Sequence, residues 1–278
     1  MIRTLTKGIL PAAVCCVFSA NAFASTASTS TEETTFLDRV SGTIAVDYSR
    51  NAYKSSSYKA RRSTGISAGL RYKTDADVVL GVNGRTQYSY DMEEGWFEQD
   101  IWLSATKGNL FKPYEWLTIG GDIRAAIPVS EYSDKTKLNT AVRGAITFAF
   151  DLSSWAEGLR FTYQPRAMKN FHKYKTAGGQ NLIEWDLSGY YELAYGYQDW
   201  TFIVGAINNH TWTYKGNYNH PSLTHQEYIG YQLTDSLSLG VGHTNSISFF
   251  DPSRGPAPVT RLLDFKNSSF YALAVYSF

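Results

Sequence analysis

The chain has 278 residues and a formal net charge of +1, and no run of basic residues indicates a nucleic-acid partner. Aromatic residues make up 15% of it, with 20 Tyr and 7 Trp, while the mean hydropathy is −0.29. Because no long uninterrupted apolar segment occurs, membrane-spanning helices are excluded, and the length fits one large β domain or two small mixed ones.

Residues 1–24 are typical of a secretory signal peptide. Arg3 and Lys7 form a short basic region, and an apolar run over residues 8–19 follows it. This run is too short to cross a bilayer as a helix. The segment that follows, Ala22-Phe23-Ala24, has small residues at its first and third positions, which is typical of a cleavage site. We therefore predict that the signal is removed after Ala24.

Both cysteines of the chain, Cys15 and Cys16, lie inside this signal peptide. After cleavage no cysteine is left for a disulfide or a thiolate metal site. Lipidation at Cys15 is the alternative, but Val14 is bulky at a position where lipidation signals use a small residue.

The segment after the cleavage site is predicted to be a disordered leader over residues 25–40. Its first eleven residues are almost all Ser, Thr and Glu, a composition too polar and too simple to form a core. Residues 41–278 are predicted to form one β domain, with no repeat beyond the alternation described next and no sign of a second domain.

Apolar and polar residues alternate along most of this domain, and turn residues separate the alternating segments. No window shows a convincing helical period, and residues 131–138 read as a charged loop. Around residues 110–114 the connection is longer than a tight turn. Twelve antiparallel strands are predicted, with ten or fourteen as alternatives, at about 41–49, 64–73, 77–90, 97–105, 117–127, 142–150, 159–166, 183–193, 200–214, 224–233, 236–249 and 261–278.

One face of these strands is apolar and the other carries charges. A membrane-spanning barrel has this pattern with a soluble-looking average hydropathy, because only every second residue faces lipid. A charge near the bilayer midplane costs about 2–4 kcal/mol, so the charged face should be an inner, wet or ion-paired surface. The predicted pore-lining residues are Asp47, Arg71, Arg85, Asp100, Asp122, Arg124, Arg143, Arg160, Arg166, Glu184, Asp186 and Glu192.

The last strand shows the apolar face most clearly. Phe270, Ala272, Ala274, Tyr276 and Phe278 fall on one face. The segment resembles the carboxy-terminal strand of Gram-negative outer-membrane β-barrel proteins, which typically ends in Phe with an aromatic residue two positions earlier. Alanines stand here where larger residues are common in that family.

This resemblance implies an up-and-down transmembrane barrel in the bacterial outer membrane, in contact with lipid and lipopolysaccharide. It also implies insertion by the barrel-assembly machinery through the strand that ends at Phe278. An even strand count places both chain termini in the periplasm.

Barrel size and small inner residues favour a porin-like channel. Eight strands give a filled interior and sixteen an aqueous channel, so twelve lie between. Small residues on the charged face leave space: Gly69, Gly81, Gly120, Ala145, Ser188, Gly240 and Gly242. We predict a narrow channel for small hydrophilic solutes with a mixed-charge lumen. The alternatives are a barrel plugged by ion pairs, or a surface-binding barrel (adhesin or phage receptor) that uses loop tyrosines such as Tyr53, Tyr58, Tyr132, Tyr174 and Tyr218.

An outer-membrane lipid hydrolase is the least favoured alternative. The outer-membrane phospholipase A family uses a His and a Ser two residues apart on a lipid-facing strand, with an Asn nearby. His243 and Asn245 share an outer face here, but Ser246 points inward. No enzyme activity and no cofactor are therefore predicted.

The remaining histidines are predicted to lie in or near outer loops, without a metal role. Their spacing matches no recognised metal motif, so we expect solvated side chains at His172, His210, His220 and His225.

Overall fold

The computed structural model describes residues 36–54, 57–91, 94–219, 221–251, 255–256, 265 and 268–278. The predicted signal peptide and residues 25–35 of the leader lie outside the described residues. All described residues belong to one compact unit, Phe36–Phe278.

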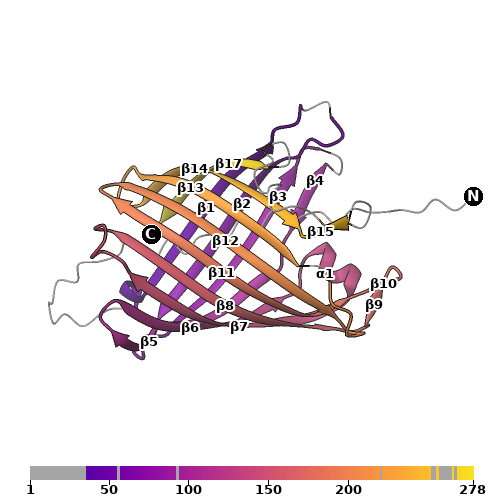
Figure 1. The fold of residues 1–278 in the computed structure, drawn as a ribbon, viewed down its shortest axis with the longest axis horizontal. Helices are drawn as coiled ribbons and strands as arrows, with labels where there is room; N and C mark the ends of the chain where they lie inside the picture. Colours follow the sequence, from indigo (N-terminus) through magenta and orange to yellow (C-terminus); the bar gives the residue numbers. More distant parts are fainter. Residues whose placement is uncertain are drawn as a thin grey trace, which may run out of the picture. The chain divides into compact units, whose positions relative to one another are not determined.

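Twelve antiparallel strands close into a barrel in this unit (Figure 1). They are β1 (Val40–Asn51), β2 (Arg62–Lys73), β3 (Val79–Ser89), β5 (Ile101–Tyr114), β6 (Leu117–Ile127), β7 (Leu138–Asp151), β8 (Leu159–His172), β11 (Ile183–Tyr197), β12 (Trp200–Thr213), β13 (Ser222–Gln232), β14 (Leu237–Ser248) and β17 (Ser269–Ser277).

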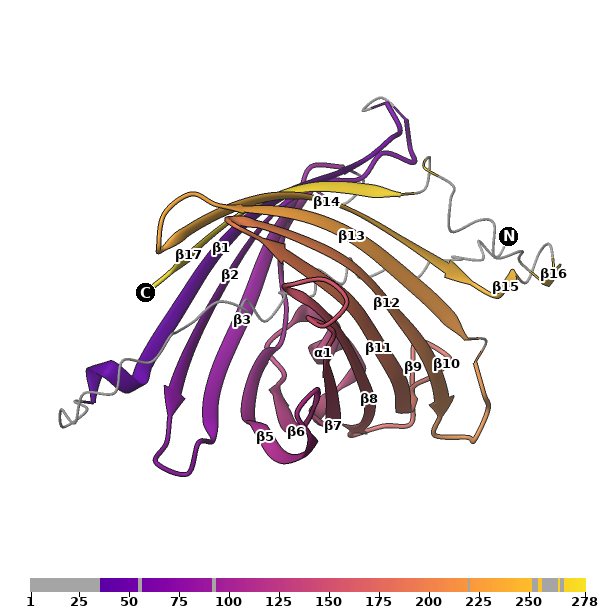
Figure 2. The same cartoon turned by 60° about the vertical axis from the view of Figure 1, so that its left-hand side comes forward.

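The remaining elements are short. They are the 3₁₀-helix η1 (Leu37–Arg39), the helix α1 (Glu131–Thr136), and the strands β4 (Gly95–Glu98), β9 (Thr176–Ala177), β10 (Gln180–Asn181), β15 (Phe250–Asp251) and β16 (Gly255–Pro256). Strand β4 pairs with β3, while β9–β10 and β15–β16 form two separate small hairpins. The β9–β10 hairpin projects from the connection between β8 and β11 (Figure 2). In the part of the chain that the structure describes, neither helix is long and apolar enough to cross a membrane.

Neighbouring barrel strands follow one another in sequence, and β17 returns to pair with β1. Backbone hydrogen bonds complete this last contact, from Gly42 N to Phe278 O at 2.8 Å and from Phe278 N to Gly42 O at 3.0 Å. Because a closed barrel leaves none of its main strands as an edge, its backbone donors and acceptors are paired within the sheet. The predicted twelve-stranded antiparallel barrel is confirmed.

Alternation across the sheet produces the two predicted faces. Ile44, Ile123 and Val241 on the outer face are 47%, 64% and 58% exposed, whereas Asp47 and Asp122 on the inner face are 2% and 5% exposed. Residues that are paired across neighbouring strands lie on the same face of the sheet. The separation into an apolar outer face and a charged inner face therefore continues from strand to strand around the barrel.

Aromatic side chains gather where β5, β7 and β17 end. Tyr114 and Trp116 stack at 5.1 Å, Trp116 stacks on Phe150 at 6.0 Å, and Tyr276 and Phe278 lie 6.2 Å apart. Such a girdle is typical of the membrane interface in outer-membrane barrels.

The structure corrects three predicted local features. Residues 110–114 are not a long turn, because β5 continues to Tyr114 through two register shifts after Lys107 and only Glu115 and Trp116 connect it to β6. The disordered leader cannot extend to residue 40, since Leu37–Arg39 form a 3₁₀-turn and β1 begins at Val40.

The third correction concerns the charged loop predicted at residues 131–138, which contains the helix α1. Ser130 caps this helix by accepting a hydrogen bond from Ser133 N, and Lys137 ends it in the left-handed conformation. An ion pair between Lys135 and Glu131, one turn apart, supports it. A helix of 6 residues is too short to produce a periodic apolar stripe, so its pattern could not be read from the sequence.

Gly42 packs closely against the ring of Phe278 where β1 meets β17. A Cβ atom added at Gly42 would overlap three ring atoms of Phe278. We expect Gly42→Ala to lower the free energy of unfolding by about 1–3 kcal/mol, because the ring must leave its site beside β1. Urea unfolding of the protein in lipid bilayers measures this change.

Gly144→Ala is the matched control, because an added Cβ at this position of β7 meets no atom within 4 Å. Equal stability of the two variants would contradict the proposed role of the Gly42–Phe278 contact.

Candidate functional site

The inner face of β1–β3 carries a buried ion pair between Asp47 and Arg85. The guanidinium group donates from Nη1 to Oδ1 at 2.6 Å and from Nη2 to Oδ2 at 3.0 Å, and the two side chains are 2% and 8% exposed. Strand β2 lies between the two partners, with Gly65 directly opposite both Asp47 and Gln87. A Cβ at Gly65 would collide with the guanidinium and the carboxylate. The glycine therefore provides the space in which the pair crosses β2.

A second group of charges centres on Asp122 in β6. Arg124 donates from Nε to its Oδ2 at 2.7 Å, Arg143 donates from Nη2 to the same oxygen at 3.3 Å, and Gln164 donates to Oδ1 at 3.3 Å. The Asp122 side chain is 3% exposed, so its carboxylate is enclosed by these donors. Two arginines therefore share one carboxylate.

The group continues onto β8 and β11. Arg166 donates from Nε to Gln164 Oε1 at 2.6 Å, and its guanidinium lies 4.6 Å from the ring centre of Tyr190. The hydroxyl of Tyr190 in turn donates to the carboxylate of Glu192. These contacts place Arg166 and Glu192, two predicted pore-lining residues, in one connected network.

Register relates the remaining predicted inner residues to this network. Arg71, Gly81, Ser104, Arg124 and Arg143 follow one another along a single row of cross-strand partners. The same row reaches Met168 and then Asp186. It therefore holds three arginines and one carboxylate on the inner face. Arg160 lies on this face at the beginning of β8, opposite Ala194, and is exposed.

Two predicted pore-lining residues have partners outside this network. Asp100 accepts hydrogen bonds from Val129 N and Ser130 N at 3.0 and 2.9 Å and from Ser133 Oγ at 2.5 Å, so it anchors the connection that leads into α1. Glu184 lies at a register shift in β11. Its carboxylate pairs at 3.4 Å with Lys169, whose ammonium lies over the ring of the outer-face residue Trp185. The shift interrupts the alternation that placed Glu184 beside Asp186.

Several of the small inner residues pack against other groups. At Gly230 and Gly240 an added Cβ would meet the ring of Tyr228, and at Gly242 it would meet the ring of Tyr271. These two tyrosine rings stack at 6.5 Å on the inner face. Here the glycines let aromatic rings lie flat against the wall, so the predicted free space at Gly240 and Gly242 is filled. At Gly69, by contrast, an added Cβ would come no closer than 3.3 Å to another atom, so more space is left there.

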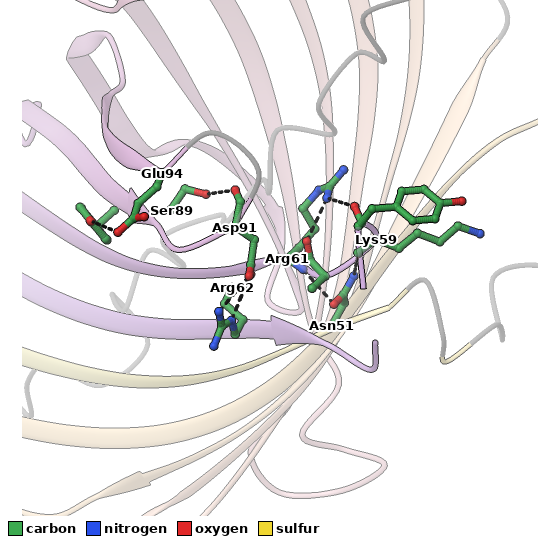
Figure 3. A network of polar contacts seen from close by, with 10 residues as sticks. Asn51, Lys59, Arg61, Arg62, Ser89, Asp91 and Glu94 are labelled. Carbon is green, nitrogen blue, oxygen red and sulfur yellow. Dashed lines mark hydrogen bonds and ion pairs between the residues drawn. The ribbon is translucent and has the colours of Figure 1, made fainter. Parts of the chain in front are cut away.

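A polar network connects the ends of β1, β2 and β3 (Figure 3). Asn51 donates from Nδ2 to Lys59 O and accepts from Arg61 N, at 2.8 and 3.0 Å. Arg62 binds Asp91 through Nε and Nη2, the latter at 2.9 Å. The Arg62 guanidinium holds the pKa of Asp91 below its ordinary value, so both partners of this ion pair are charged at neutral pH. The pair joins the beginning of β2 to the β3–β4 connection.

The residues of the hydrolase alternative lie as the alternation predicts. His243 and Asn245 are on the outer face of β14. The Ser246 hydroxyl contacts that of Thr224 at 2.6 Å, and both residues lie on the opposite face. The prediction of solvated loop histidines is wrong for His172, His210 and His225, which lie in β8, β12 and β13. His172 and His210 contact the hydroxyls of Tyr214 and Tyr218, and His225 contacts the carboxylate of Glu227. His220 lies outside the described residues.

No family model and no curated protein match this sequence. Among solved structures, the barrel is similar to an outer membrane channel from Pseudomonas putida F1, with a TM-score of 0.58, 12% identity, and coverage of 86% of this chain and 95% of that chain. It is also similar to the NanC porin, with a TM-score of 0.54, 9% identity, and coverage of 84% and 98%. The fold is therefore that of a porin-like outer-membrane β-barrel.

The Asp47–Arg85 pair gives a stability prediction. Asp47→Asn leaves a buried guanidinium without its carboxylate, so we expect the free energy of unfolding to fall by about 3–5 kcal/mol. Denaturant unfolding in a bilayer, followed by tryptophan fluorescence, measures this loss.

The control is Asp77→Asn. It breaks the Lys73–Asp77 pair, whose side chains are 63% and 74% exposed, and exposed pairs contribute only about 0–1 kcal/mol. The assignment fails if both substitutions have the same small effect.

Proposed function

We propose that this barrel is a channel for small hydrophilic solutes in the outer membrane of a Gram-negative cell, with a narrow lumen of mixed charge. The observation that carries the proposal is that the inner-face ion pairs run along the barrel wall, between nearby strands. Asp47 pairs with Arg85 two strands away, and Asp122 contacts β6, β7 and β8. Charges neutralised along the wall do not need a partner across the lumen, which favours an open passage over a plug of ion pairs.

The tyrosines of the inner face support the same proposal. Tyr228 and Tyr271 lie over glycines instead of standing away from the wall. Two solved barrels with similar folds are named as an outer membrane channel and as a porin. Interior charges and their field then select among solutes, since wall charges in a narrow pore act over short distances.

Location and assembly are part of the proposal. An apolar outer face with an aromatic girdle suits lipid and lipopolysaccharide as surroundings. Removal of the signal near Ala24 and insertion by the barrel-assembly machinery through β17 remain predictions from the sequence.

Single-channel conductance in planar bilayers tests the proposal. We expect discrete conductance steps, and we expect Arg124→Gln combined with Arg143→Gln to shift the reversal potential in a salt gradient towards cation selectivity. The shift follows because two positive charges leave the wall around Asp122. Heat-modifiable migration in gels shows whether the variant is folded.

The control removes charges from the outer face, through Lys169→Gln combined with Glu184→Gln, and should leave the reversal potential unchanged. Absence of conductance from the folded protein would overturn the proposal and favour a plugged or surface-binding barrel. Phospholipid hydrolysis that disappears in His243→Ala would instead support the hydrolase alternative.

A further inference from the structure

Three metal-ligand side chains converge on the outer face of the β13–β14 hairpin. His225 and Glu227 are two residues apart on β13, and His243 lies directly opposite Glu227 on β14. His225 Nδ1 is 2.9 Å from Glu227 Oε1, and His243 Nδ1 is 2.6 Å from Glu227 Oε2. Both imidazoles thus face the same carboxylate.

The surroundings make this cluster unusual. Ile229 and Val241, the next outer-face residues of the same two strands, are 43% and 58% exposed and apolar. The ring of Phe270 lies 5.0 Å from that of His243. An ionised carboxylate on an apolar outer surface is costly unless it has a strong partner. The two histidines provide one, and a cation between them would be a stronger one.

The donor set indicates which cation fits. Two imidazole nitrogens and a carboxylate suit Zn²⁺ and related transition metals, whereas Ca²⁺ and Mg²⁺ require oxygen ligands. The three candidate ligand atoms lie within 4.8 Å of one another, so small side-chain movements would bring each to about 2.0–2.2 Å from a central ion.

We propose that His225, Glu227 and His243 form a binding site for a Zn²⁺-type ion on the outside of the barrel wall. Binding needs each Nδ1 lone pair, so the ring proton must be on Nε2. Among the described residues, Nε2 of His243 has no hydrogen-bond partner, so this tautomer can form without losing a hydrogen bond there.

Access to the site is provided by an adjacent groove. Val241, His243 and Phe270 line it together with Arg50 from β1. The three protein ligands leave a remaining position of a tetrahedral ion to water or another oxygen ligand. A bound ion would join β13 to β14 through their side chains as well as their backbones.

Isothermal titration of the untagged, folded protein with Zn²⁺ in a non-chelating buffer tests the proposal. We expect about one equivalent to bind, and Co²⁺ substitution to give the visible absorption of a tetrahedral site. Glu227→Gln and His243→Ala should each weaken binding by about tenfold or more, and the combined His225→Ala and His243→Ala substitutions should abolish it.

His210→Ala is the matched control. His210 is an outer-face histidine like His225 and His243, but it contacts the hydroxyl of Tyr218 and is not part of the cluster. It should bind Zn²⁺ like the unsubstituted protein. Failure of the folded, unsubstituted protein to bind, or unchanged binding in the doubly substituted protein, overturns the proposal. Because the cluster is on the outer face, this result is independent of whether the barrel conducts.

Discussion

Closure of a single sheet is the constraint on which the rest of the structure depends. Once β17 pairs with β1, the backbone hydrogen bonds of the twelve strands are made around the ring, and each strand must present alternate residues to two different surroundings. There is no separate core layer to absorb an exception. A glycine or a register shift is therefore the means by which this barrel accommodates a side chain that does not follow the pattern.

Inner-face charge shows how closely local pairing and barrel geometry are connected. Asp47 reaches Arg85 across β2 because Gly65 has no side chain in the space between them. Asp122 accepts hydrogen bonds from its own strand and from the next two strands. Such pairs stay against the wall. Arg124 and Arg143 share the carboxylate of Asp122, whereas Asp47 and Arg85 pair one to one.

Much of the fold could be predicted from sequence because alternation is a local property. The strand at residues 117–127 has the predicted bounds, and the apolar face of β17 is as predicted. What could not be predicted depends on contacts between distant residues or on local irregularity. Asp100 looks like any alternating residue until the β6–β7 connection folds onto it, and Glu184 changes its surroundings at a register shift.

The outer-face cluster was missed for the same reason. His225 and Glu227 are visible as neighbours on one face, but nothing in the sequence aligns them with His243, 16 residues beyond Glu227. The signal that could have found it is Glu227 itself, which shares a face with Ile229 and therefore needed a partner outside its own strand.

The tyrosines that lie over glycines have a consequence for how this barrel can vary. Tyr228 covers Gly230 and Gly240, so the height of its ring above the sheet is determined by residues underneath it. A single methyl group at either glycine would tilt the phenol away from the backbone and towards the axis. The inner diameter of the barrel beside Tyr228 can therefore change through substitutions at glycines that lie beneath the ring.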